Sequence, residues 1–152
     1  MRLKGKVAVI YGAGGAIGGA VARAFGNEGA RLFLAGRHGR PLEAVADDVV
    51  SHGGSAEATE VDALDERAVD EHLEAVIDRA GGIDVSFNAI GIPNPRVRAP
   101  LLEMDVEQFS LPIATYTRSY FLTARLAARR MVAASRVGSG IVQSRVTVLK
   151  LS

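Results

Sequence analysis

Cysteine and tryptophan are absent from this chain of 152 residues, and aromatic residues make up only 5% of it. Without cysteine, disulfides and thiolate chemistry are excluded, which is typical of a protein of a reducing cytosol. The histidines (His38, His52 and His72) lack the spacing of zinc ligands, so no metal site is expected. The first residues lead directly into an apolar strand, without a secretory signal. We therefore predict a cytoplasmic protein.

Long apolar runs and an excess of either charge are also lacking. No window approaches the roughly 18 apolar residues of a membrane span, so no membrane partner is expected. The net charge is +1, and the arginines are too isolated to predict binding of nucleic acid. The chain has instead 48% apolar residues and 17 glycines. This composition indicates one α/β domain over residues 1–152.

The stretch from Lys6 to Arg37 is the most informative part of the sequence. An apolar strand runs into a cluster of glycines, an Ala-rich helix follows, and a second apolar strand ends in Gly-Arg. Glycines let the backbone approach a pyrophosphate, and a helix N-terminus offers free N–H groups to it. Strand, glycine turn, helix and strand together predict a βαβ unit that binds a dinucleotide.

Strand and helix patterns alternate along the rest of the chain. We expect strands near 6–11, 31–36, 56–61 and 83–88, and helices near 16–28, 41–51, 65–79 and 113–134. Asp65 is expected to cap the third helix, and Gly81-Gly82 to end it. This alternation predicts a Rossmann-type, doubly wound parallel sheet of about five strands. Residues 140–152 predict an atypical last strand, because Gln143, Ser144 and Arg145 are too polar for a central one.

The glycine cluster fits the spacing GxxxGxG, with Gly12 and Gly18 at the ends and Ala16 in place of the middle glycine. The Ala16 methyl group lies where the backbone would approach phosphate. A glycine-rich turn without a ligand is the alternative, but the βαβ context favours dinucleotide binding.

The end of the second expected strand bears on which dinucleotide is bound. An acidic residue there accepts hydrogen bonds from the ribose hydroxyls of NAD, but this chain has Arg37, with His38 and Arg40 nearby. Arg37 suits the 2′-phosphate of NADP(H), or else it only solvates a loop. The third and fourth strands end in Asp62 and Asn88. The predicted cofactor site is therefore Gly12, Gly14, Gly15, Ala16, Ile17, Gly18, Arg37, Asp62, Ala63, Asn88, Ala89 and Ile90.

These motifs in order resemble the short-chain dehydrogenase/reductase family. They are the GxxxGxG spacing, the arginine after the second strand, Val61-Asp62, and a degraded NNAG from Phe87 to Gly91. The resemblance implies a seven-stranded sheet, of which this chain would supply about five strands, and hydride transfer between NAD(P)(H) and a carbonyl or alcohol. NADP(H) is expected over NAD(H). The small-molecule substrate is not predicted.

The resemblance also implies a catalytic Tyr and Lys spaced YxxxK, a Ser after the fifth strand and an Asn on the preceding helix. That pair cannot be built here, because the chain holds only Tyr11, Tyr116, Tyr120, Lys4, Lys6 and Lys150. Tyr11 lies in the cofactor turn, Tyr116 takes the place of the helical Asn, and Ser144 is the candidate serine. An unassisted tyrosine with a pKa of about 10 is a poor base at neutral pH. The catalytic residues therefore stay unassigned.

Two functions of different classes remain open. The chain is either the cofactor-binding portion of an NADP(H)-dependent oxidoreductase, truncated or shifted in reading frame near its end, or a non-catalytic NADP(H)-binding or oligomerising module or remnant. The stripe of Leu122, Leu126 and Met131 either packs against a second copy or only covers the sheet. Arg118 and Arg125 are expected on a solvated helix face.

Overall fold

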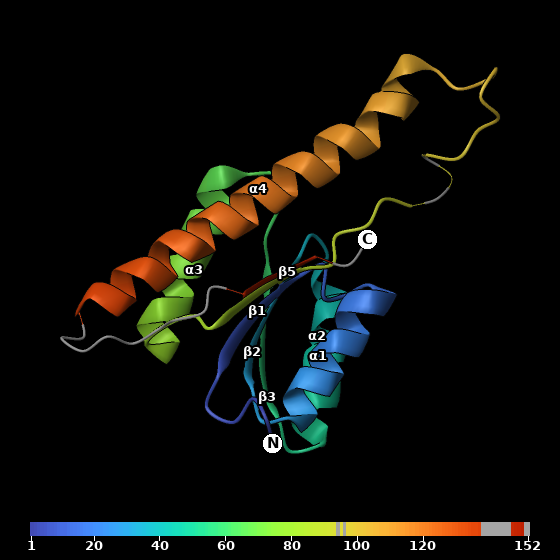
Figure 1. The fold of residues 1–152 in the computed structure, drawn as a ribbon. Helices are drawn as coiled ribbons and strands as arrows, with labels where there is room; N and C mark the ends of the chain where they lie inside the picture. The colour runs from blue at the N-terminus through green and yellow to red at the C-terminus, as the bar shows by residue number, and fades with distance from the viewer. Residues whose placement is uncertain (94, 96, 138–146, 151–152) are drawn as a thin grey trace.

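A five-stranded parallel sheet with helices on both faces forms the described part of the chain (Figure 1). The computed structural model describes residues 1–152 apart from 94, 96, 138–146 and 151–152. The strands lie in the order β3-β2-β1-β4-β5. Because the chain crosses from β3 back to β4 beside β1, the sheet is wound in two directions from its centre. The predicted α/β fold class and the parallel sheet are confirmed.

The elements follow the predicted alternation closely. The strands are β1 (Val7–Tyr11), β2 (Arg31–Gly36), β3 (Ser55–Glu60), β4 (Val85–Asn88) and β5 (Thr147–Lys150), and the helices are α1 (Ala16–Asn27), α2 (Gly39–Ser51), α3 (Glu66–Ala80) and α4 (Val106–Val137). The Asp65 side chain accepts from the N–H groups of Arg67 and Ala68, and Gly81 ends α3 with a φ of +80°. The predicted cap and stop of α3 are thus confirmed.

The two faces of the sheet carry separate apolar cores. Side chains of β1 alternate between them, with Val9 and Tyr11 packing toward α3 and α4 and with Ala8 and Ile10 packing toward α1 and α2. Figure 1 shows α1 and α2 on one side of the sheet and α3 and α4 on the other. The alternation explains why β1 is apolar throughout: both of its faces are covered.

The start of α4 differs from the prediction, since the helix begins at Val106 and not near 113. The Asp105 carboxylate accepts from the Gln108 N–H at 2.7 Å, and the Gln108 amide oxygen accepts from the Asp105 N–H at 3.2 Å. These two bonds form a capping box, and the helix continues through Pro112 despite the missing N–H there. The first part of α4 extends well past the sheet (Figure 1).

The predicted stripe on α4 covers the sheet. Leu122, Leu126 and Met131 are all buried, and the latter two belong to the core shared with α3. Arg118 is exposed, as expected for a solvated helix face, Arg125 is half-buried, and both reach the start of α3. Arg118 Nε donates to the Leu64 carbonyl at 2.7 Å, and Arg125 pairs with Glu66 at 3.0 Å.

The last described element, β5, pairs in parallel with β4, with Val85 opposite Thr147 and Asn88 opposite Lys150. A strand was predicted within 140–152, and β5 takes its second half. Gln143, Ser144 and Arg145 lie outside the described residues. No helix among the described residues is long and apolar enough to cross a membrane.

Candidate functional site

A pocket of about 870 Å³ lies at the carboxyl edge of the sheet, where the loops after β1, β2, β3 and β4 meet α4. Ligands bind at this edge in doubly wound sheets. The pocket gathers ten of the predicted cofactor residues from four separate loops: Gly12, Gly14, Gly15, Ala16, Ile17, Arg37, Asp62, Ala63, Ala89 and Ile90. The other two, Gly18 and Asn88, do not line it.

At two positions, one in the turn and one in α1, close backbone contacts leave no room for any residue other than glycine. Gly12 has a φ of +73°, and a Cβ atom on it would lie 2.6 Å from the Ala89 carbonyl oxygen. A Cβ atom on Gly18 would lie 2.2 Å from the Gly12 carbonyl oxygen. Glycine at position 18 therefore lets α1 pack directly against the backbone of the turn at Gly12. The turn stays tight, so a ligand can approach its backbone.

The first turn of α1 lies at the pocket. Gly15 is the N-cap in an extended conformation, and no side chain among the described residues caps the helix. Ala16 and Ile17 follow at the opening, and Ile17 is 58% exposed. A helix start of this kind binds anions, because its N–H groups and the positive end of the helix dipole point outward.

The loop after β2 contributes positive charge to the same pocket. Arg37 and His38 line it, and Arg40 follows in the first turn of α2. The Arg37 and Arg40 side chains are exposed and, within the described part of the chain, make no hydrogen bond or ion pair. Their guanidinium groups are thus available to an anionic ligand.

The ends of β3 and β4 are held by side-chain bonds to the backbone. The Asp62 Oδ1 accepts from the Leu64 N–H at 2.9 Å, which orders the turn into α3. The buried Asn88 Oδ1 accepts from the Ile90 N–H at 3.0 Å, and its Nδ2 donates to the Thr123 hydroxyl at 3.1 Å. Asn88 therefore fixes the loop that lines the pocket.

The tyrosines lie in two settings, Tyr11 in the core and Tyr116 and Tyr120 on α4. Tyr11 ends β1 and does not lie in the turn, and its buried ring meets His72 edge to face at 6.2 Å. Burial raises the Tyr11 pKa far above its ordinary value. Tyr116 stacks on Tyr120 at 6.0 Å, and its hydroxyl accepts from the Ile92 N–H at 3.4 Å.

Sequence reasoning missed a group of pocket residues from the loop after β4 and from α4, among them Ile92, Pro93, Leu111 and Thr115. The Pro-rich composition of residues 92–100 indicated a loop at the carboxyl edge of the sheet, where ligands bind, but it did not single out Ile92 or Pro93. Leu111 was missed because the predicted helix began too late to include it. The capping pair Asp105 and Gln108 was the signal that would have placed Leu111 on α4.

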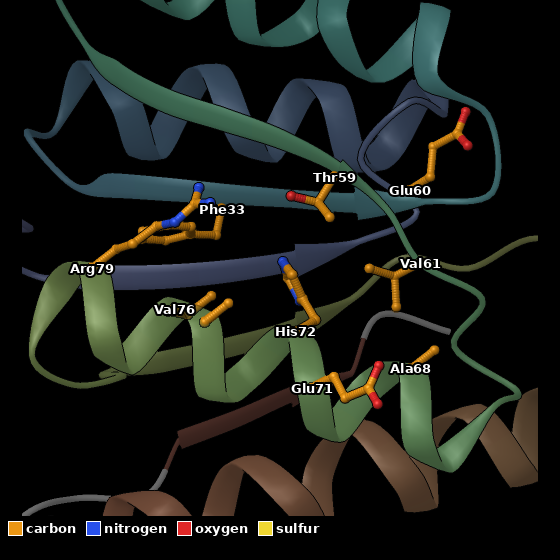
Figure 2. A pocket seen from close by; sticks show the side chains of 10 residues that line it. Phe33, Thr59, Glu60, Val61, Ala68, Glu71, His72, Val76 and Arg79 are labelled. Atoms are coloured by element: carbon orange, nitrogen blue, oxygen red, sulfur yellow. The ribbon is translucent and has the colours of Figure 1, made fainter.

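A second pocket of about 300 Å³ lies between α3 and the edge strand β3, and none of the predicted cofactor residues lines it. Figure 2 shows the His72 ring pointing from α3 toward β3, near Thr59. His72 is 7% exposed, and neither ring nitrogen has a partner in the described residues. Burial, with a smaller effect of Arg79, lowers the His72 pKa to about 4, so the ring is neutral at pH 7.

This second pocket lacks the features of a reactive site. Arg79 at its rim is already paired with Glu57 at 2.6 Å. Among the described residues, no group of three or more His, Cys, Asp or Glu side chains has a geometry that could hold a metal ion. The larger pocket, with its uncapped helix and unpaired arginines, is therefore the candidate site.

Comparisons with known proteins agree with the geometry. A family model for short chain dehydrogenases matches residues 6–147. An uncharacterized oxidoreductase of Bacillus subtilis, YxbG, is 35% identical over 124 residues, which are 82% of this chain and 45% of that protein. The 7alpha-hydroxysteroid dehydrogenase of Clostridium sardiniense is 30% identical over 147 residues, covering 97% of this chain and 55% of that protein.

Solved structures give the same assignment. A short-chain type dehydrogenase/reductase from Mycobacterium marinum has 37% identity and a TM-score of 0.78, with 87% of this chain and 52% of that chain covered. A metagenomic short-chain oxidoreductase in complex with NADP has 33% identity and a TM-score of 0.78, with coverages of 89% and 60%. The chain spans about half the length of these relatives. The chain belongs to the short-chain dehydrogenase family.

Proposed function

We propose that residues 1–152 form a single domain that binds NADP(H) in the large pocket, with the pyrophosphate at the start of α1. The observation that carries this proposal is the uncapped first turn of α1 above a turn that admits only glycine at Gly12 and Gly18. The nicotinamide of such a cofactor supplies hydride transfer when bound. The residues of this chain bind the cofactor and orient it.

NADP(H) is proposed over NAD(H) because Arg37 lines the pocket with an unpaired guanidinium, while β2 ends without an acidic residue. A guanidinium pairs well with a phosphate, and a carboxylate at the same place would repel one. The metagenomic relative was solved with NADP, which is consistent with this preference.

Reduction of a carbonyl or oxidation of an alcohol is the activity that we propose for the whole protein, in line with its family. The 152 residues contain no Tyr and Lys spaced YxxxK. Proton transfer to the substrate therefore needs a group other than a Tyr and Lys pair with this spacing. We expect the purified chain to bind NADPH without turning over ketones or quinones.

The second candidate is a non-catalytic module that binds NADP(H) and self-associates. It is favoured by large apolar side chains that α4 leaves exposed, such as Phe109 at 60%, Ile113 at 54% and Phe121 at 60%. Light scattering of the purified chain would report a stable homo-oligomer if this second function holds.

The proposed binding function is tested by titrating the chain with NADPH and NADH and following nicotinamide fluorescence. Arg37→Ala is expected to raise the NADPH Kd about tenfold and to leave the NADH Kd unchanged, because only NADPH carries the 2′-phosphate. Arg129→Ala is the matched control, since Arg129 is exposed on α4 and lies outside the pocket.

Two outcomes would contradict the proposal. Absence of binding of either dinucleotide would remove the function itself. Equal weakening of NADPH and NADH by Arg37→Ala would remove the preference. Turnover of a ketone by the wild-type chain would favour the enzyme over the non-catalytic module.

A further inference from the structure

Glu60 is an acidic residue next to the loop that carries Arg37, where the 2′-phosphate is proposed to bind. It is the last residue of β3 and pairs in register with Gly36, the residue directly before Arg37. The Gly36 carbonyl accepts from the Val61 N–H at 2.9 Å, so the two strand ends stay together up to this point. The backbone of Glu60 is therefore fixed next to the loop that carries Arg37.

The Glu60 side chain reaches that loop. Its Oε1 accepts from the Gly39 N–H, the first residue of α2, at 2.7 Å. A Cβ atom on Gly39 would lie 2.8 Å from the same oxygen, so the carboxylate rests directly on the backbone. Glu60 lines the rim of the smaller pocket, and Figure 2 shows its side chain directed away from His72.

This bond gives α2 an acidic cap that its own N-cap residue does not provide. His38 precedes the helix without a side-chain cap bond. The positive groups of the loop, Arg37 and Arg40, and the negative group, Glu60, thus lie around the same helix start. Neither arginine pairs with Glu60 among the described residues.

We propose that Glu60 is a selectivity residue, whose carboxylate opposes the 2′-phosphate of NADP(H) and keeps NAD(H) in competition for the site. This inference rests on the proposed function. A phosphate bound by Arg37 meets the negative charge of Glu60 across the start of α2, or else displaces the carboxylate from the Gly39 N–H. Either event lowers the affinity for NADP(H), whereas NAD(H) brings no phosphate to this position.

The test compares NADPH and NADH titrations of the wild-type chain with those of Glu60→Gln. The glutamine oxygen still accepts from the Gly39 N–H, so the variant removes the charge and keeps the cap. The NADPH Kd is expected to fall about three- to tenfold, the size expected for one unit charge opposite a phosphate at a partly solvated surface. The NADH Kd is expected to stay within about twofold, and the NADPH effect to shrink at about 0.5 M salt.

Glu74→Gln is the matched control, because Glu74 is exposed on α3, makes no bond among the described residues and carries the same charge. Glu60→Ala is a second variant, expected to shift the ratio of the two Kd values in the same direction while lowering Tm. The inference is overturned if the ratio of the NADPH Kd to the NADH Kd is the same in Glu60→Gln as in Glu74→Gln. It is also overturned if NADH alone binds more weakly, since Glu60 would then be a ribose acceptor. A wild-type chain that binds neither dinucleotide would instead refute the proposed function.

Discussion

Helices α1 and α3 begin at the same edge of the sheet, yet their first turns are finished differently. The start of α3 is closed by Asp65, whose carboxylate accepts from two N–H groups of its first turn. The start of α1 has only Gly15 before it and no side-chain cap. A helix whose first N–H groups lack hydrogen-bond acceptors is less stable than a capped one, unless a ligand supplies the acceptors. Helix α3 is thus capped by its own sequence, whereas the first turn of α1 is left open for the pyrophosphate of the proposed function.

The two helices also differ in what they bury. Helix α1 packs through glycine and alanine, and its core contains only apolar side chains. Helix α3 buries His72 against Tyr11, and among the described residues these two side chains carry the buried polar atoms without a partner. The packing of α1 therefore depends on close backbone contact at glycine. On the side of α3, buried polar atoms without hydrogen bonds lower the stability of the fold.

The largest effect is expected from Gly18→Ala in α1. The new methyl group would lie 2.2 Å from the Gly12 carbonyl oxygen and 2.8 Å from the Ala13 Cα, and both are backbone atoms that cannot turn away. We expect a loss of about 3 kcal/mol in the free energy of unfolding, measured in urea. NADPH binding should be lost with it.

Gly82→Ala is the control for that change, because a Cβ atom there meets nothing within 4 Å. Its unfolding free energy should stay within about 0.5 kcal/mol of the wild type. A Gly18→Ala variant that keeps both its stability and its NADPH affinity would show that the turn can relax, contrary to the contacts described.

The next effect is a loss of stability in acid that depends on His72. Its pKa is about 4 in the folded chain against an ordinary value of 6.5, because burial disfavours the charged ring. Between those values the unfolded chain binds a proton that the folded chain does not. Stability therefore falls as the pH is lowered from about 7 to about 4, by on the order of 3 kcal/mol.

His72→Leu separates this effect from the titration of carboxylates, which it leaves in place. The variant should lose less stability between pH 7 and pH 4 than the wild type does, and it should be more stable at pH 7 by about 1 kcal/mol. Parallel pH profiles for the two proteins would mean that His72 is solvated or finds a partner in the folded chain.

The contrast between the helices also marks what the sequence could predict. Local signals were enough for β1, the turn at Gly12, the cap at Asp65 and the stop at Gly81, because each depends on residues close together in the chain. The meeting of the four loops at one pocket followed from the parallel sheet, whose carboxyl ends share an edge.

Features that depend on distant contacts were not predicted. Nothing near His72 in the sequence indicates that its ring lies against Tyr11, and nothing near Glu60 indicates that it caps α2. The start of α4 was placed too late because the capping box at Asp105 and Gln108 was overlooked. Tertiary packing decides the first two, and a closer local analysis would have found the third.

Giving α1 the kind of cap that α3 has would test the comparison directly. Gly15 has a φ of −83°, which any residue adopts, so Gly15→Asp can place a carboxylate on the first turn. We expect the unfolding free energy to rise by a few tenths of a kcal/mol. The NADPH Kd should rise at least about tenfold, because the carboxylate takes the N–H groups and repels the pyrophosphate.

Gly15→Ala separates the charge from the added Cβ, which would lie 3.4 Å from the Gly12 carbonyl oxygen in both variants. Equal weakening by Ala and Asp would assign the loss to the methyl group and not to the cap. No weakening by Asp would place the pyrophosphate away from α1.

The smallest effect is expected from removing the cap of α3. Asp65→Ala deletes the acceptor of bonds from the Arg67 and Ala68 N–H groups, at 2.9 and 3.2 Å, and should cost about 1 kcal/mol of unfolding free energy in urea. Asp65→Asn keeps an acceptor and should recover most of that loss. Because Asp65 does not line the pocket, the NADPH Kd should stay the same in both variants. A raised Kd in the alanine variant alone would mean that the cap of α3 also positions the Asp62 loop, so that the two helix starts are coupled and not independent.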